Sequence, residues 1–253
     1  MNPGTTLASD NFQRANENPL SYGGRWAAYL PGTFGNLEVA SDVCQPSALS
    51  LDCSAYWAET TFPADQWASI TLGALITNTT HIIFLRASAA TETFYEGFVE
   101  NGIGYQIKKF VAGTSTILAT AAVTPKSGDV VLFEAQGTNL TLSVNGITVA
   151  TATDSSIASG LVAIDLYSSS SMALSDSTIT LFQAGNFLTP TRTWSAVDSR
   201  IFPNRIVTIQ GTDQYTVQTS SNESIPSPDS REVGAPTDSR IASPQNSRSA
   251  PPF

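Results

Sequence analysis

Positive charge, histidine and cysteine are all scarce in this chain. Its 253 residues include twelve Lys and Arg against 21 Asp and Glu, one histidine and two cysteines. The net charge of −9 argues against a nucleic-acid surface, which needs a basic stripe to neutralise phosphates, and against binding to anionic lipid. His81 is the single histidine, so a metal site with two histidines cannot form within one chain. It starts the apolar run Ile82–Leu85, where we expect a structural or an exposed histidine.

Long hydrophobic runs and an export signal are also missing. No segment approaches the ~20 apolar residues of a membrane span. The N-terminus, Met1–Thr6, lacks the basic and apolar regions of a secretory signal, so we expect synthesis and assembly in the cytoplasm. Cys44 and Cys53 have a spacing that allows a loop-closing disulfide but not a four-ligand zinc site. Cytoplasmic synthesis favours reduced thiols in a loop, although an extracellular particle could oxidise them later.

Composition divides the chain into a domain and a tail. Apolar periodicity stops near Phe187, and residues 190–253 are dominated by Ser, Pro, Thr, Asn and Arg. Residues 1–189 hold six basic and fifteen acidic residues, and 6 − 15 accounts for the whole net charge of −9. We therefore predict one domain over 1–189, followed by an extended arm over 190–253.

The periodicity of the domain is that of β-strands. Asn145-Gly146 lies between two alternating runs, which is the strongest short hairpin signal, and a Pro63-Ala64-Asp65 turn separates two other β-rich runs. No amphipathic helical run is present, so helix should be minimal. Evenly spaced short strands of this kind predict an all-β antiparallel jelly-roll sandwich. Besides short strands near the N-terminus, we expect strands at 37–41, 55–62, 67–76, 81–87, 93–100, 104–111, 115–122, 129–136, 139–145, 147–153, 160–167 and 176–183.

Several segments carry a family resemblance. The opening Asp10-x-Phe12-x-Arg14, the run Ile107–Gly113 and the segment Asp154–Gly160 are similar to laminin-G/concanavalin-A-like jelly rolls, found in sugar-binding modules and bacteriophage virion proteins. The resemblance covers residues 8–187 and implies that the first strand pairs with the last. Many such domains hold a structural Ca²⁺, for which Asp10, Asn11 and Asp176 would be the candidates; otherwise no cofactor is expected.

No catalytic signature is evident. Jelly-roll glycosidases of the family resembled place Glu-x-Asp-x-x-Glu on one strand, and this motif does not occur here. Glu92, Glu96 and Glu100 share one strand face, but Phe94 and Phe98 share it too. We interpret the three carboxylates as a solvated or partner-facing rim, and we expect no enzyme.

A sugar site would need an exposed aromatic ring with hydrogen-bonding groups around it. Tyr22 and Trp26 are among the aromatics that could serve. Tyr56 and Trp57 face opposite sides of a strand, so at most one of them packs into a given core layer. The other is the best single candidate for contact with a ligand or another subunit. The candidate contacts are Tyr56, Trp57, Tyr95 and Tyr105.

The tail contains a repeated unit, Asp/Asn-Ser-Arg followed within a few residues by Pro. Such a unit cannot bury a core and suits an arm laid across a neighbouring subunit, each arginine binding a carboxylate; a flexible linker is the alternative. Residues 205–218 look like a small hairpin. The candidate assembly residues are Arg200, Arg231, Arg240 and Arg248.

These features lead to a hypothesis of function that rests on the resemblance. We expect a non-enzymatic bacteriophage virion protein, a capsid decoration or a tail-associated adhesion protein, that assembles as a homo-oligomer or with other virion proteins and can contact a surface glycan. The alternative is a carbohydrate-binding module of a bacterial surface or secreted protein whose leader is missing.

Overall fold

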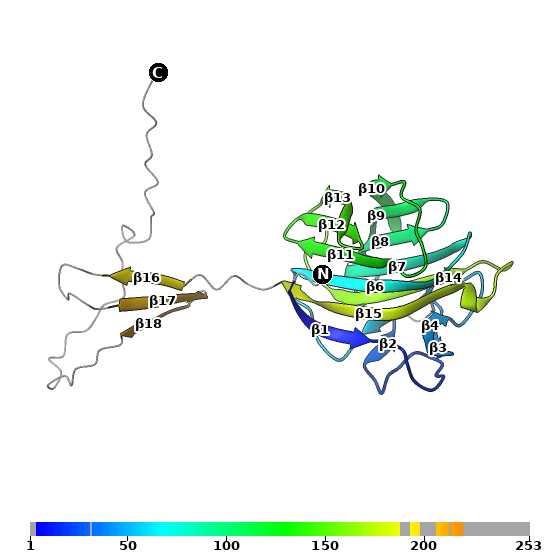
Figure 1. Cartoon of the computed structure of the whole chain (residues 1–253), viewed down its shortest axis with the longest axis horizontal. Helices are drawn as coiled ribbons and strands as arrows, with labels where there is room; N and C mark the ends of the chain where they lie inside the picture. The colour runs from blue at the N-terminus through cyan, green and yellow to red at the C-terminus, as the bar shows by residue number, and fades with distance from the viewer. Residues whose placement is uncertain (1–3, 31, 188–192, 198–205, 213, 220–253) are drawn as a thin grey trace, which may run out of the picture. The chain divides into compact units, whose positions relative to one another are not determined.

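The computed structural model describes residues 4–30, 32–187, 193–197, 206–212 and 214–219. The chain divides into two compact units, Met1–Thr189 and Pro190–Phe253 (Figure 1). The first unit is an antiparallel β-sandwich, which confirms the predicted fold class.

One layer of the sandwich is an eight-stranded sheet in the order β13-β12-β11-β6-β15-β4-β3, with β1 also pairing with β15. The first strand therefore pairs with the last strand of the sandwich, as the resemblance implies. The strands are β1 (Gly4–Asp10), β3 (Leu37–Ala40), β4 (Val43–Pro46), β6 (Gln66–Leu75), β11 (Val130–Gln136), β12 (Asn139–Val144), β13 (Ile147–Thr153) and β15 (Ser177–Phe187).

The other layer is a seven-stranded sheet in the order β10-β9-β8-β7-β14-β5-β2. Its strands are β2 (Trp26–Ala28), β5 (Cys53–Trp57), β7 (Thr79–Ala87), β8 (Phe94–Glu100), β9 (Gly104–Val111), β10 (Thr114–Ala121) and β14 (Leu161–Ser168). The helical content of the described residues is one 3₁₀ turn, η1 (Leu174–Asp176), and no helix there is long and apolar enough to cross a membrane.

Alternation along the strands builds the core between the two sheets. On β7, Ile83 and Leu85 belong to this core, whereas Ile82 and Phe84 belong to a second apolar cluster on the opposite face of the sheet. At the centre of the main core, the ring of Trp26 lies 5.2 Å from that of Trp57. Residues buried between the sheets include Ile70, Phe133, Leu142, Ile164 and Phe182.

Turn chemistry fixes the hairpins. Asn145 and Gly146 both adopt positive φ, 51° and 80°, which a type I′ turn between β12 and β13 requires. A turn at Asn101 and Gly102 joins the paired strands β8 and β9. The Asn145-Gly146 turn is as predicted, and the strands form two meanders, β8 to β10 in the seven-stranded sheet and β11 to β13 in the eight-stranded sheet.

The two cysteines are free and buried, in β4 and β5 rather than in a loop. Burial raises the pKa of the Cys44 thiol well above its usual range, which makes the thiol inert as a nucleophile. His81 is buried as well, and its Nε2 lies 3.0 Å from the carbonyl oxygen of Thr178. Burial lowers the pKa of His81 to about 4, so the ring is a neutral structural group.

The second unit contains a three-stranded antiparallel sheet in the order β16 (Thr193–Val197), β17 (Ile206–Thr212) and β18 (Gln214–Thr219). The pair β17 and β18 lies where the sequence predicts a hairpin, and β16 adds a third strand. Arg200, Arg231, Arg240 and Arg248 lie outside the described residues, so the assembly arm stays a prediction.

Arg86 ties three loops to the end of β7. Its side chain is 3% exposed, and its guanidinium donates hydrogen bonds to the carbonyl oxygens of Ala64 (2.8 Å), Ile157 (3.0 Å) and Gly137 (2.8 Å). Asp65 lies 3.6 Å away as the nearest carboxylate. A buried cation is tolerated here because several oxygens replace its hydration.

We expect Arg86→Met to lower the free energy of unfolding by about 3 to 5 kcal/mol, because the three carbonyl groups lose their charged donor. Arg25→Met is the matched control, since Arg25 is 42% exposed and its ion pair contributes at most about 1 kcal/mol. Urea unfolding of both variants checks this. A loss below about 1 kcal/mol for Arg86→Met would show that Arg86 does not hold the loops.

Candidate functional site

Three of the four aromatic side chains predicted to contact a ligand are buried between the sheets. Trp57 is 2% exposed, and Tyr95 and Tyr105 are fully buried. The hydroxyl of Tyr95 donates to Asp154 at 2.7 Å, and that of Tyr105 donates to Asp129 at 3.0 Å. The prediction of a surface contact is therefore corrected for these three: each is a core residue, and each tyrosine hydroxyl is held within the chain.

Tyr56 is on the other side of its strand from Trp57, as alternation predicts, and it is half-buried. Its ring packs on the face of the seven-stranded sheet that points away from the core, here called the outer face. Strand register aligns two rows of side chains across this face. The first row is Ala27, Tyr56, Ala163, Phe84, Glu96, Lys108 and Ile117, and the second is Ser54, Asp165, Ile82, Phe98, Gln106 and Thr120.

The chain itself covers much of the outer face. Tyr29, from the segment after β2, lies 5.8 Å from the ring of Phe84 and 6.3 Å from that of Phe94. The rings of Phe84 and Phe94 are 4.0 Å apart, and both are 2% exposed. Aromatic rings sealed in this way cannot stack on a sugar.

Two charged groups of the outer face, Lys108 and Glu96, bind one another. Lys108 donates a hydrogen bond to Glu96 at 3.2 Å, and its ammonium lies 3.1 Å from the centroid of the Phe98 ring. Glu96 is 3% exposed, so its interpretation as part of a solvated rim was wrong. Asp165 is fully buried, and its Oδ2 accepts a hydrogen bond from the hydroxyl of Ser54.

The pKa of Glu96 is raised to about 7, because the effect of burial outweighs the opposing effect of the Lys108 ammonium. Burial likewise raises the pKa of Asp165 well above its usual range, and the charge of Asp52 adds to the shift. A carboxyl group with a pKa near 7 can act as a general acid, but it would have to reach a substrate. Glu96 points into a closed ion pair instead.

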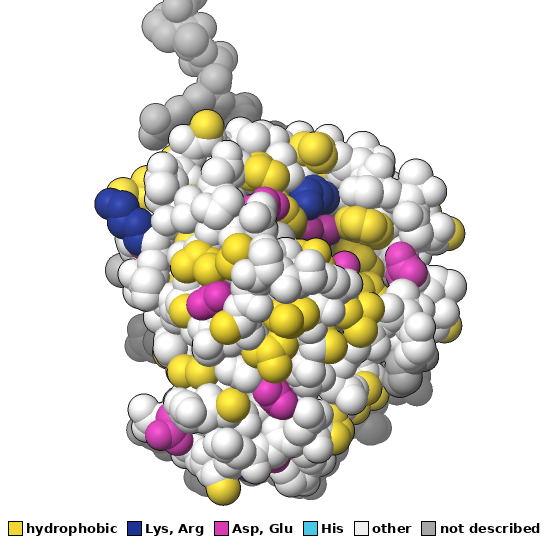
Figure 2. Space-filling view, turned by 90° about the vertical axis from the view of Figure 1, so that its right-hand side faces the viewer, with side chains coloured by type: hydrophobic (Ala, Val, Ile, Leu, Met, Phe, Trp, Pro, Cys, Tyr) yellow, Lys and Arg dark blue, Asp and Glu magenta, His cyan; other side chains and the backbone are white. Residues whose placement is uncertain are grey.

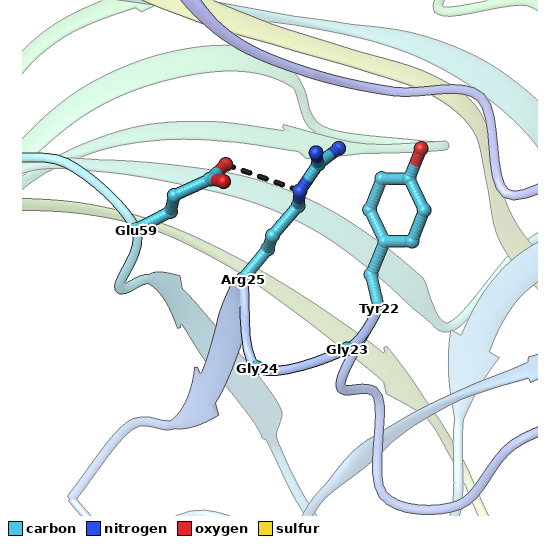
Figure 3. Close-up of a pocket in the computed structure, with 5 residues that line it drawn as sticks. All are labelled: Tyr22, Gly23, Gly24, Arg25 and Glu59. Carbon is cyan, nitrogen blue, oxygen red and sulfur yellow. Dashed lines mark ion pairs between the residues drawn. The ribbon is translucent and has the colours of Figure 1, made fainter.

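An open hollow lies beside β2, the strand at one end of the seven-stranded sheet. It is lined by Tyr22, Gly23, Gly24, Arg25 and Glu59 (Figure 3). Arg25 Nε and Glu59 Oε2 form an ion pair at 3.1 Å, and their side chains are 42% and 50% exposed. In Figure 3 the Arg25 guanidinium lies between Glu59 and the Tyr22 ring, and its centre is 4.5 Å from the ring centroid.

Strand pairing explains why Arg25 meets Glu59. Trp26 of β2 is opposite Trp57 of β5, so the residues that flank this pair are neighbours. The amide of Ala58 donates to the carbonyl of Arg25 at 2.6 Å, and Glu59 follows directly. The sequence alone gives no such signal, because 33 residues separate Arg25 and Glu59.

The backbone of the hollow is unusual. Tyr22, Gly23 and Gly24 all adopt positive φ, at 49°, 69° and 93°. Glycine accepts this conformation without cost, whereas Tyr22 adopts it at a cost of order 1 kcal/mol. A carboxylate oxygen of Glu17 accepts hydrogen bonds from the amides of Ser21 and Tyr22, at 3.2 and 3.0 Å, and fixes the turn.

A second arginine supports the Tyr22 ring from inside the chain. The guanidinium of Arg14 lies 4.3 Å from the ring centroid and is paired with Asp10 at 2.7 Å and with Glu17 at 2.6 Å. Burial opposes ionisation of Glu17, yet the hydrogen bonds from Arg14, Ser21 and Tyr22 lower its pKa. The ring is thus positioned by its own network, while Arg25 and Glu59 face solvent.

The residues considered for calcium do not converge. Asp10 accepts hydrogen bonds from the amide of Phe12 and from Trp26 Nε1, in addition to Arg14. Asp10 is opposite Phe182 on β15, and Asp176 lies six residues earlier, which corresponds to roughly 20 Å along the strand. One cation could not bind both.

Comparisons with known proteins bear on the fold. No family model matches the sequence, and no curated protein does. Among solved structures, the chain is similar to the carbohydrate-binding module CBM66 from Bacillus subtilis, with 14% identity over 64% of this chain and 92% of that one and a TM-score of 0.50.

Two further solved structures are similar to this chain in fold. A Bacillus subtilis protein of unknown function with a galectin-like fold has 9% identity over 73% of this chain and 97% of its own, with a TM-score of 0.54. The exoplasmic/lumenal domain of VIP36, in a Ca²⁺/Man3GlcNAc-bound form, has 11% identity over 68% and 87%, with a TM-score of 0.51. The chain thus has a galectin-like, concanavalin-A-like jelly-roll fold, and a virion role stays a prediction without support from these structures.

The Glu96 carboxyl gives a testable dependence of stability on pH. Its folded pKa, about 7, is above the ordinary value of 4.5, so its favourable contribution is complete below pH 4.5 and is lost as the pH rises through 7. We expect the stability advantage of wild type over Glu96→Gln to fall by roughly 2 to 3 kcal/mol between pH 4.5 and 8. Urea unfolding at both pH values measures it; an advantage that is constant or grows with pH would contradict the assignment.

Proposed function

We propose that this protein is a non-catalytic carbohydrate-binding domain and that the hollow beside β2 is its ligand site. The observation that carries the proposal is the exposed Arg25 and Glu59 pair next to the Tyr22 ring. A donor and an acceptor side by side in an open hollow are groups that sugar recognition uses. The Tyr22 ring contacts Arg14 and Arg25, so it orients the guanidinium, and the Arg25 and Glu59 side chains would bind the sugar hydroxyls. The similar folds of a carbohydrate-binding module and of a domain bound to a mannose-containing glycan support it.

The chemistry of the hollow favours a neutral sugar with adjacent hydroxyl groups. Arg25 uses Nε for Glu59, and in Figure 3 its two Nη groups point to the same side as the Tyr22 hydroxyl. One sugar hydroxyl can accept from the guanidinium while its neighbour donates to the carboxylate. Arg14 and Arg25 face the three carboxylates of Asp10, Glu17 and Glu59, and this net negative charge disfavours acidic sugars.

The outer face is the rival location, and its geometry argues against it. Its aromatic rings are sealed by Tyr29, and its ammonium group is bound to Glu96. A ligand there would have to displace contacts that the chain already makes. In the hollow the Arg25 and Glu59 side chains are 42% and 50% exposed, so a ligand can reach their ion pair from solvent, and the hollow is preferred for that reason.

A binding experiment on the full chain tests both the activity and the place. The chain is screened on a glycan array, and the best neutral oligosaccharide is titrated by calorimetry. We expect Arg25→Met and Glu59→Gln each to weaken binding at least tenfold, which corresponds to about 1.4 kcal/mol. Lys126→Met removes one positive charge at another exposed position, as Arg25→Met does in the hollow, and it should leave the affinity unchanged.

Two other results would contradict the proposal. Loss of binding in Lys108→Met, with Arg25→Met unaffected, would move the site to the outer face and keep the function. No binding to any neutral or acidic glycan by correctly folded protein would overturn the function itself.

A further inference from the structure

His81 is the single histidine of the chain, and its ring lies between the two sheets. It is on the same face of β7 as the core residues Ile83 and Leu85, and it is fully buried. Its Nε2 lies 3.0 Å from the carbonyl oxygen of Thr178 on β15, so a neutral ring with its proton on Nε2 donates a hydrogen bond to the opposite sheet. Figure 2 shows acidic side chains on one face of the molecule and no histidine there, in agreement with this burial.

The backbone at Thr178 departs from the regular ladder. The register of β15 with β6 shifts between Ser177 and Ile179, and Thr178 has no partner in it. The hydroxyl of Thr178 accepts a hydrogen bond from the amide of Ala74 at 2.6 Å, which holds this irregular segment. A second bond between the sheets is adjacent, because the hydroxyl of Ser177 donates to the carbonyl of Thr80 at 3.0 Å. Two hydrogen bonds therefore join the start of β7 to the start of β15.

Within the described residues, no carboxylate lies beside His81 to balance a positive charge. The strands across the core from it, β6 and β15, contain no titratable residue. The titratable groups of the other elements packed nearby are turned elsewhere. Glu96, Glu100, Asp165 and Tyr167 lie on the outer face, Glu134 lies on the face of the eight-stranded sheet away from the core, Tyr95 donates to Asp154, Asp176 accepts from the amide of Ala173, and Arg86 donates to carbonyl oxygens at the far end of β7.

These surroundings keep the ring neutral. Burial lowers the pKa of His81 to about 4, and the carbonyl groups of Thr178 and Ala74 oppose the shift only in part. Nδ1, which would take up the proton, is buried and makes no hydrogen bond. Protonation would thus place an unpaired charge in the core, which costs more than the hydrogen bond to Thr178 contributes.

We propose that His81 is an acid-sensitive link between the two sheets, which holds the start of β7 to β15 while the ring is neutral and releases it when the ring takes up a proton. The far end of β7 is held by Arg86, which keeps its charge throughout this range of pH, so the opening is local. The link is independent of the sugar site, because β14 and β5 separate β7 from β2 in the sheet.

The direction of the pH dependence follows from the two states of the chain. The folded pKa of His81, about 4, is below the ordinary value of 6.5, so the contribution of the neutral ring is complete above pH 6.5 and is lost as the pH falls through 4. Glu96 has the opposite dependence, since its contribution is lost as the pH rises. A variant that lacks only the titration of His81 separates the two effects.

Urea unfolding of the full chain at pH 7.5 and pH 5 tests the titration. In His81→Gln the side-chain amide can still donate to Thr178 but takes up no proton. We expect the folding equilibrium constant of the wild type, relative to that of His81→Gln, to fall at least about tenfold between pH 7.5 and pH 5. Glu96→Gln is the matched control, for which the corresponding ratio should rise. A ratio for His81→Gln that is constant or rises toward pH 5 would overturn the proposal.

Nuclear magnetic resonance of the wild type tests the same link without a variant, because a single histidine gives one set of imidazole signals. We expect a neutral ring with its proton on Nε2 that does not titrate down to pH 5. Amide exchange, corrected for its intrinsic rate, should accelerate between pH 7.5 and pH 5 at 80–83 and not at 85–87, beside Arg86. A ring that titrates near 6.5 in the folded chain, or exchange that changes equally along β7, would contradict the link. Neither measurement involves a sugar, so a failure here is separable from a failure of the proposed function.

Discussion

The carboxylate of Asp10 links the core of the sandwich to its surface hollow. It is 2% exposed and accepts hydrogen bonds from Phe12, Arg14 and Trp26, so one buried charge joins β1, the following loop and β2. Trp26 belongs to the core, and Arg14 supports the Tyr22 ring of the hollow. A buried carboxylate is stable only with such donors, and these donors fix the loop that carries the site. The Asp-x-Phe-x-Arg opening of the sequence thus fixes the loop that carries Tyr22.

Coverage of the outer face decides where a ligand can bind. A sheet face with aromatic, carboxylate, amide and ammonium side chains in two rows has the composition of a binding surface. Tyr29 covers the rings of Phe84 and Phe94, and Lys108 binds Glu96. Side chains of the protein itself therefore occupy the groups that a ligand on this face would contact. The loop between β1 and β2 stays partly exposed at Tyr22 and Arg25, and the ion pair of Asp10 and Arg14 fixes this loop. The proposed site therefore lies on a loop and not on the sheet.

The fold was predictable because it depends on local patterns. Alternation located the strands, and Asn145-Gly146 fixed a hairpin that needs no distant partner. That Tyr56 and Trp57 face opposite sides of their strand followed from the same alternation, which did not say which of the two points outward. Burial was harder to predict, because a strand has two faces and alternation does not say which one a loop will cover. Tyr95 and Tyr105 were expected at the surface for that reason, and both are core residues.

The site was less predictable because it depends on register between strands far apart in sequence. Tyr22 was one of several aromatics considered, and its neighbours Gly23, Gly24 and Arg25 form a local turn signal that the prediction did not use. Glu59 could not be assigned, since only the pairing of Trp26 with Trp57 brings it to Arg25. Glu96 was misread for a related reason: its burial depends on Lys108 from the neighbouring strand and on the cover above the sheet.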